Sequence, residues 1–111
     1  MFRIIDGRGT GKTCRAILLA KEYDGVVASK SPKAIIERAN YLGLSNIRSC
    51  SYQDVIDKNY PQGKRIFIDD IECFAEHCAP GLLGYSLSTW NHDYEDEKLK
   101  LKCDKIYMNM E

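Results

Sequence analysis

A glycine-rich segment near the start of the chain has the residue types that bind an anion. Three glycines alternate with other residues and a Lys-Thr pair follows: Gly7, Gly9, Gly11, Lys12 and Thr13. Glycines let consecutive backbone N–H groups point at one centre, and a helix that begins there adds unpaired N–H donors and the positive end of its dipole. A lysine in this place can reach nucleotide β- and γ-phosphates, and a threonine hydroxyl can bind Mg²⁺. The segment is therefore predicted to bind phosphate.

A second chemical feature is an acidic pair at the end of an apolar segment. Residues 64–68 run from basic to apolar, and Asp69 and Asp70 follow them directly. Taken alone, a strand that ends in Asp-Asp is better explained by a helix N-cap and a solvated neighbour. With the glycine-rich loop upstream, the pair instead favours a Mg²⁺ site in which Asp69 faces Thr13.

Both segments resemble motifs of the P-loop NTPases. The loop resembles the Walker A motif G-x-x-x-x-G-K-[ST], anchored on Gly11, Lys12 and Thr13, with Asp6 where the first glycine is expected. Residues 66–70 resemble a Walker B strand. The order of elements is similar to the additional-strand type of this superfamily, which includes AAA, helicase and packaging-motor domains. Small ATP-binding proteins encoded by bacteriophages also look similar.

This resemblance implies a role for each residue of the two motifs. The nucleotide would be bound by eight consecutive residues: Gly7, Arg8, Gly9, Thr10, Gly11, Lys12, Thr13 and Cys14. The resemblance places Mg²⁺ between Thr13 and Asp69, and it gives catalytic roles to Lys12, Asp70 and Asn109. Lys12 would neutralise charge on the γ-phosphate, Asp70 would orient the attacking water, and Asn109 would act as the polar sensor at the end of the last strand.

Two departures from the family pattern favour binding over fast hydrolysis. Asp6 brings a negative charge to the phosphate site, and Asp70 is one methylene shorter than the glutamate often found at its position. No arginine stands in an obvious finger position, so efficient hydrolysis would need a cation from a partner protein or from a second copy of the chain.

Strands and helices are expected to alternate along the chain. Apolar runs predict strands over residues 2–5, 25–29, 46–51, 64–70 and 105–109, and helices are predicted from the loop to Tyr23 and over residues 31–43, 52–56 and 71–78. Residues 82–98 show no period and are expected to form a loop or hairpin. This alternation predicts an α/β three-layer sandwich with a mainly parallel sheet of about five strands, whose carboxyl ends collect the loop, the acidic pair and Asn109.

Length and composition restrict the number of domains, the partners and the cellular location to be expected. The 111 residues predict a single nucleotide-binding domain over residues 1–111, and sixteen basic residues balance sixteen acidic ones, which argues against autonomous DNA binding. No export signal or apolar span is apparent, so a cytoplasmic protein is expected, in the host cytoplasm if the chain is viral. The five cysteines are expected to be reduced thiols; a zinc site of Cys73, His77, Cys78 and Cys103 is the weaker alternative, because no C-x-x-C pair exists.

The residues together favour a Mg-dependent ATP- or NTP-binding protein with weak ATPase activity, accessory to nucleic-acid metabolism. Two other classes remain open. In a small-molecule kinase acting on nucleosides or nucleotides, the segment after residue 82 would close over a phosphoryl acceptor. In a non-enzymatic interaction module, the loop would be retained only as a structural anion site.

Overall fold

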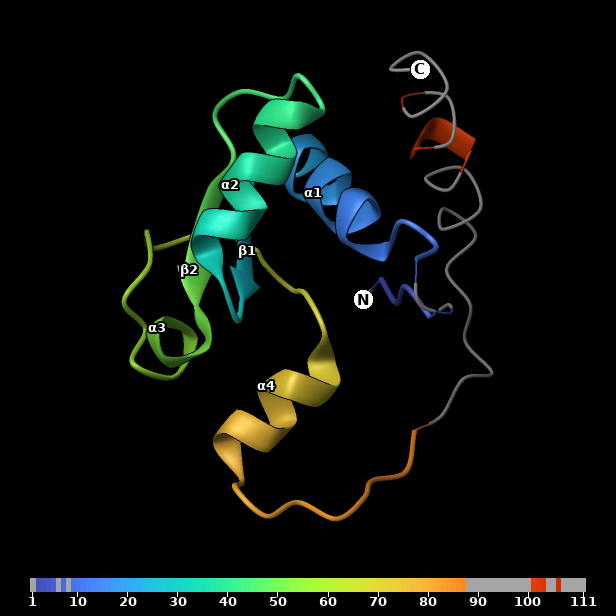
Figure 1. Ribbon diagram of the computed structural model, residues 1–111. Helices are drawn as coiled ribbons and strands as arrows, with labels where there is room; N and C mark the ends of the chain where they lie inside the picture. The colour runs from blue at the N-terminus through green and yellow to red at the C-terminus, as the bar shows by residue number, and fades with distance from the viewer. Residues whose placement is uncertain (1, 6, 8, 88–100, 104–105, 107–111) are drawn as a thin grey trace.

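The computed structural model describes residues 2–5, 7, 9–87, 101–103 and 106. In this part of the chain, helices and strands alternate as the sequence predicts (Figure 1). The elements are α1 (Lys12–Glu22), β1 (Val26–Ser29), α2 (Pro32–Tyr41), β2 (Arg48–Ser51), α3 (Tyr52–Ile56), β3 (Ile66–Ile68) and α4 (Ile71–Cys78). The α/β class is confirmed.

The three strands form one parallel sheet in the order β2-β1-β3. Val27 of the central strand lies opposite Ser49 of β2 and Phe67 of β3. Parallel neighbours cannot be joined by a tight turn, and the segments that return the chain contain α2 and α3. The carboxyl ends of all three strands therefore lie at one edge, where the acidic pair follows β3.

Helices cover both faces of this sheet. On one face, Val27 packs with Ile17 of α1 and Ile35 of α2. On the other face, Val26 packs with Tyr52 of α3, and Phe74 of α4 joins the same cluster. Since successive strand residues point to opposite faces, β1 contributes to both cores and all four of its residues are buried. Helix residues thus pack on both faces of a three-stranded sheet, and the three-layer sandwich of the full chain stays a prediction.

Gly25 lets β1 begin close to β3. A Cβ built on this residue would lie 2.7 Å from the ring of Phe67 and 2.8 Å from the backbone oxygen of Arg65. Both approaches are too short for any larger residue, and the second atom belongs to the backbone. The backbone N–H of Val26 donates to the same Arg65 oxygen at 2.8 Å, which fixes the register of the two strands at this end.

The prediction of about five strands is wrong for the described part of the chain, which contains three. Residues 2–5 form no strand. Phe2 and Ile4 instead pack their side chains against α1, and the ring of Phe2 lies 5.3 Å from that of Tyr23. Apolar burial is thus achieved without a ladder of backbone hydrogen bonds. Of the last predicted strand, only Ile106 is described, and it is helical.

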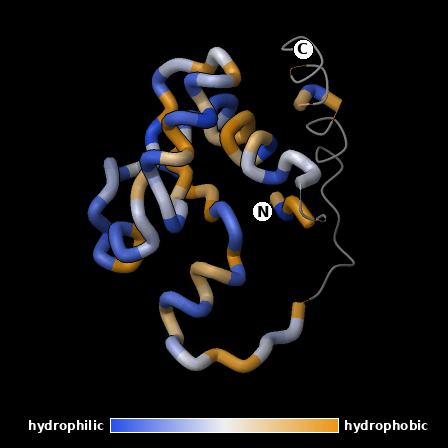
Figure 2. The backbone as a smooth tube through the Cα atoms, in the orientation of Figure 1, coloured by the Kyte–Doolittle hydropathy of each residue, from blue (hydrophilic) through white to orange (hydrophobic). Residues whose placement is uncertain are grey.

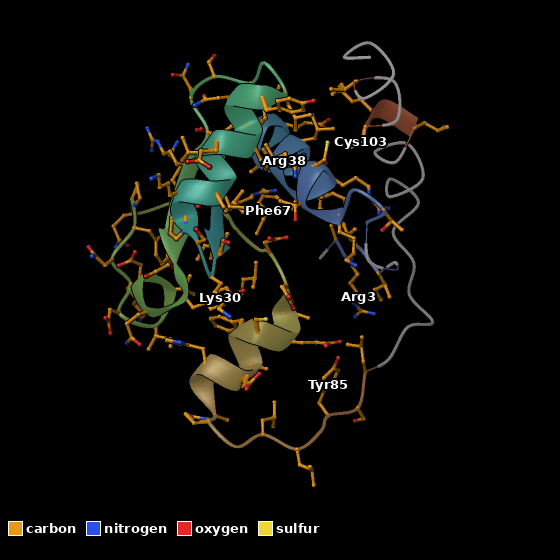
Figure 3. All side chains as sticks on the ribbon, viewed as in Figure 1. Arg3, Lys30, Arg38, Phe67, Tyr85 and Cys103 are labelled. Atoms are coloured by element: carbon orange, nitrogen blue, oxygen red, sulfur yellow. The ribbon has the colours of Figure 1, made fainter. Side chains whose placement is uncertain are left out.

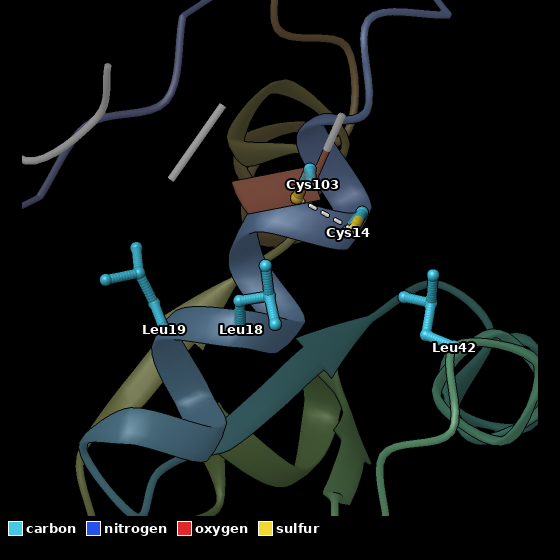
Figure 4. Close-up of a cluster of buried hydrophobic side chains, with 5 residues drawn as sticks. All are labelled: Cys14, Leu18, Leu19, Leu42 and Cys103. Atoms are coloured by element: carbon cyan, nitrogen blue, oxygen red, sulfur yellow. Dashed lines mark hydrogen bonds between the residues drawn. The ribbon is translucent and has the colours of Figure 1, made fainter. Parts of the chain in front are cut away.

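Helix α1 has the longest run of buried residues among the described elements. Seven consecutive residues, from Cys14 to Ala20, are buried. Besides the sheet and α2, α1 is covered by Phe2 and Ile4 and by two residues from the far end of the chain, Cys103 and Ile106. Figure 4 shows the sulfur of Cys103 against that of Cys14, at 2.8 Å. Residues distant in sequence therefore meet on the helix that begins at the glycine-rich loop.

The segment that follows α4 carries apolar side chains that are exposed and not part of the core. Figure 2 shows apolar residues along α1 and, apart from it, in the extended segment that follows α4. Leu82, Leu83, Tyr85 and Leu87 of this segment are all exposed. The predicted irregular structure is confirmed for residues 82–87, and the remainder of that prediction lies outside the described residues. None of the described helices is long and apolar enough to cross a membrane.

Candidate functional site

Residue 7 and residues 9–13, the glycine loop, comprise the turn before α1 and the first two residues of this helix. Gly9 and Gly11 have positive φ angles of 72° and 82°, a backbone conformation that glycine adopts without steric cost. Gly11 is the N-cap of α1, and its carbonyl accepts the first helical hydrogen bond from Arg15 at 3.0 Å. No side chain caps this helix. The start of α1 therefore presents backbone donors and the positive end of an eleven-residue helix, a suitable place for an anion.

Two side chains close the glycine loop on itself. The ammonium of Lys12 donates to the carbonyl oxygen of Gly7 at 2.8 Å, and the hydroxyl of Thr10 donates to the same oxygen at 2.6 Å. Lys12 is the first residue of α1, and its side chain thus reaches back across the loop. A cation in this position can contact an anion bound by the loop without movement of the helix.

The strongest link between the two predicted motifs is a contact of Thr13 with Asp69. The hydroxyl of Thr13, in the first turn of α1, lies 3.1 and 3.3 Å from the two carboxylate oxygens of Asp69, which follows β3. These residues are 56 positions apart in the sequence. Burial raises the pKa of Asp69 above its usual value; the Thr13 hydrogen bond opposes this shift, and the negative charge of Asp70 adds to it.

The Thr13–Asp69 pair fits a Mg²⁺ ion. Mg²⁺ binds oxygen ligands at roughly 2.1 Å in octahedral geometry, which places neighbouring ligand oxygens about 3.0 Å apart. The observed 3.1 Å is close to this separation. No group of three or more acidic, histidine or cysteine side chains that could hold a metal occurs among the described residues. Other ligands would therefore come from phosphate or water, as is usual for Mg²⁺ with nucleotides.

Asp70 lies beside Asp69 but its side chain is engaged by α4. Its backbone is left-handed, with φ 63° and ψ 79°, and it is the N-cap of α4. The carboxylate accepts from the backbone N–H of Cys73 at 3.3 Å and from the Cys73 thiol at 3.2 Å. The contacts of Asp70 with Cys73 are therefore those of a helix N-cap, the alternative explanation of the Asp-Asp sequence. Its predicted role in orienting water stays a prediction.

Several predicted residues do not add a side chain to the site as described. Cys14 points into the core, where its sulfur meets that of Cys103, so only its backbone can face a phosphate. Asp6, Arg8 and Asn109 lie outside the described residues.

The cysteines and histidine of the zinc alternative have other contacts. Cys103 lies against Cys14, and a ring nitrogen of His77 lies 3.0 Å from the amide oxygen of Gln53. Cys73 donates its thiol to Asp70. Cys73, His77 and Cys78 all belong to α4, whereas Cys103 packs against α1, so the four side chains do not form one group.

One residue of the site was given no role by the sequence. Tyr52, the first residue of α3, donates its hydroxyl to the backbone oxygen of Asp69 at 2.7 Å and lies 3.3 Å from that of Asp70. Its side chain is buried, and this burial is the main cause that raises the pKa of Tyr52 to about 12. The available signal was its place directly after β2, at the edge where the acidic pair also lies.

Comparison of the chain with protein-family models, with curated proteins and with solved structures finds no match.

Proposed function

We propose that this protein binds Mg-ATP, or another Mg-nucleoside triphosphate, between the glycine loop and the acidic pair. The observation that carries the proposal is the 3.1 Å approach of the Thr13 hydroxyl to the Asp69 carboxylate. A loop suited to phosphate and a carboxylate suited to Mg²⁺ are separate patterns in the sequence. Their meeting at the carboxyl edge of a parallel sheet, where ligands of such folds bind, supports a common ligand.

Each side chain has a distinct task in the proposed complex. The backbone of the glycine loop and the start of α1 bind the phosphate oxygens, and Lys12 moves from the Gly7 carbonyl to the terminal phosphates. Thr13 and Asp69 hold the metal. A bound Mg²⁺ would neutralise phosphate charge and fix the phosphate conformation.

We further propose weak hydrolysis at this site. Water attacks the γ-phosphorus, the bond to the bridging oxygen breaks, and the products are the nucleoside diphosphate, inorganic phosphate and a proton released to solvent. Asp70 would orient the water and Asn109 would sense the γ-phosphate. Because Asp70 caps α4, this task requires its carboxylate to leave the N–H of Cys73. An arginine from a partner or a second copy would supply further positive charge. We place the activity in the cytoplasm, as an accessory to nucleic-acid metabolism.

Nucleotide binding is tested by titration calorimetry and thermal unfolding with ATP, ADP and GTP, with and without Mg²⁺. We expect Mg-ATP at a hundred times its Kd to stabilise the parent protein by about 2.7 kcal/mol. Lys12→Ala should weaken ATP binding by at least about tenfold, because a charge-assisted contact is worth more than about 1.4 kcal/mol.

Lys64→Ala is the matched control. It also removes one lysine, but Lys64 precedes β3 at the opposite edge of the sheet and pairs with the exposed Asp24. This variant should bind ATP as the parent does. If the parent is neither stabilised by ATP nor consumes it, the chain is instead an interaction module; if phosphate passes to a nucleoside or nucleotide, it is a kinase. Equal ATP affinity in Lys12→Ala and the parent would overturn the proposed site.

A further inference from the structure

A single hydroxyl group connects the strand ends that surround the proposed site. Tyr52 follows β2 directly, and its hydroxyl donates to the backbone oxygen of Asp69 after β3. Lys30 follows β1, and its backbone partly opposes the rise in the pKa of Tyr52. Figure 3 shows Lys30 between the end of β1 and α4. Tyr52 therefore links the carboxyl ends of β2 and β3.

The position of this hydroxyl is fixed by close packing of the tyrosine ring. Only 5% of Tyr52 is exposed. Its ring centroid lies 5.5 Å from that of Phe74 in an edge-to-face arrangement and 5.9 Å from that of His77. A reciprocal pair of hydrogen bonds between Ser51 and Asp54 sets the start of α3, where Tyr52 is the first residue. The ring thus has little freedom, and its hydroxyl is presented in one place.

The backbone that receives this hydrogen bond carries both carboxylates of the site. The N–H of Asp69 donates to the oxygen of Ala28 at 2.9 Å, and its carbonyl accepts from Tyr52 at 2.7 Å. The next residue, Asp70, has the left-handed conformation that non-glycine residues rarely adopt and that needs support from its surroundings. The Tyr52 hydroxyl reaches both carbonyl groups at this turn, where the chain leaves β3 and enters α4.

We propose that Tyr52 is a positioning residue for the metal: its hydroxyl fixes the turn at Asp69 and Asp70, so that the Asp69 carboxylate stays opposite the Thr13 hydroxyl. This inference rests on the proposed binding of a Mg-nucleotide. Tyr52 touches neither metal nor phosphate and acts through Asp69. Loss of its hydroxyl removes this hydrogen bond from the Asp69 carbonyl, while the Asp70 carbonyl keeps the one from the Phe74 backbone N–H. The Asp69 carboxylate can then sample positions away from Thr13. The glycine loop and Lys12 are not affected.

The test compares metal-dependent and metal-free nucleotide affinity in Tyr52→Phe. This variant keeps the buried ring and removes only the hydroxyl. The Kd for ATP is measured by calorimetry with Mg²⁺ and again with a chelator, and the ratio of the two is the gain due to metal. We expect this gain to fall by about fivefold to tenfold, which matches one lost hydrogen bond, while the metal-free Kd changes by less than about twofold.

Phe74→Leu serves as the packing control. It replaces the ring beside Tyr52 by an aliphatic side chain that still packs against it, and the Tyr52 hydroxyl is kept, so it should lower the melting temperature without lowering the gain due to metal. A second comparison uses Asp69→Asn. If Tyr52 acts through Asp69, adding Tyr52→Phe to that variant should cause no further loss of the metal-dependent gain. The double variant therefore separates positioning from a general loosening of the fold.

The outcomes distinguish this inference from the proposed function. A parent protein that does not bind ATP in either condition overturns the proposed function and the role of Tyr52 with it. A parent that binds ATP with a gain due to Mg²⁺, together with an unchanged gain in Tyr52→Phe, overturns the positioning role alone. An equal loss of gain in Phe74→Leu also overturns it, because packing and not the hydroxyl would then be responsible.

Discussion

At the end of β3, the residue Asp70 combines a left-handed backbone with a capping side chain. Its φ of 63° is unfavourable for most residues, and its carboxylate accepts from the Cys73 backbone N–H that would otherwise lack a partner in the first turn of α4. Asp and Asn are the non-glycine residues that best tolerate both conditions. The identity of this residue is thus constrained by the start of the helix as well as by any catalytic task.

Substitution of Asp70 should separate these two constraints. Asp70→Asn retains a capping oxygen and tolerates the left-handed backbone, so its free energy of unfolding should stay close to that of the parent. Asp70→Ala loses the cap and strains the backbone, and should be less stable by about 1 to 3 kcal/mol. Urea unfolding measures both values. Asp70→Gly serves as the control, because it relieves the strain and still lacks the cap. An Asp70→Ala protein as stable as the parent would contradict the capping role.

Some contacts between individual residues of the site could be predicted from the sequence, and others could not. The approach of Asp69 to Thr13 was predictable from the two motifs, and it forms although residues 2–5, which precede the loop, form no strand. The contact of Tyr52 with the carbonyl of Asp69 was not, because a side chain that binds backbone carbonyl groups requires no particular residue at those positions. The sequence also allowed Asp70 to be an N-cap of α4, but the neighbouring residues did not distinguish a cap from a residue that orients water.

Among the elements, those with local end signals were the most predictable. Ser31 and Pro32 indicated the start of α2, and the Ser31 side chain does cap that helix by accepting from Ala34. Residues 2–5 were wrongly predicted as a strand, because the same apolar run can bury its side chains with or without a ladder partner. Only the three-dimensional arrangement decides whether another strand offers N–H and C=O groups to it.

Helix α3 depends on its cap more than the longer helices do. It has five residues, too few for a helix to form without tertiary contacts and capping. The Ser51 side chain accepts from the backbone N–H of Asp54 at 3.1 Å, and the Asp54 carboxylate accepts from the backbone N–H of Ser51 at 3.0 Å. The hydrogen bond from the Ser51 backbone is the main cause that lowers the pKa of Asp54 below its usual value of 3.8.

This cap predicts a specific pH dependence of stability. Because the folded pKa of Asp54 is below the unfolded one, its stabilisation is complete above pH 3.8 and is lost as the pH falls through the folded value. Asp54→Asn should be less stable than the parent at pH 7, and the difference should shrink towards zero below pH 3.8. Unfolding in urea across this range measures it. Ser51→Thr, which keeps the capping oxygen, should behave as the parent, and a pH-independent difference for Asp54→Asn would exclude the carboxylate as its cause.

In the whole molecule, α1 joins segments from both ends of the described chain. Phe2 and Ile4 cover it on one side, and Cys103 and Ile106 pack into the same cluster. Cys14 belongs to this cluster and directly follows Thr13, so the packing of distant segments determines how the first turn of α1 is held. Sequence could show that α1 is apolar along its length, but not which segments cover it, because no pattern encodes contacts over such separations.

The contact of Cys14 with Cys103 predicts a cross-link across nearly the whole chain. The two sulfurs are 2.8 Å apart and 89 positions apart in sequence. Diamide, which accepts the two electrons and two protons that the thiols lose, should convert them to a disulfide, detected by mass spectrometry of non-reduced peptides. In the chain-entropy model a loop of this length stabilises the fold by about 4 to 5 kcal/mol, so the midpoint of urea unfolding should rise and return on reduction. Cys103→Ser should abolish both effects, whereas Cys78→Ser, at an exposed thiol, should abolish neither; a cross-link between any other pair would contradict this packing of the chain.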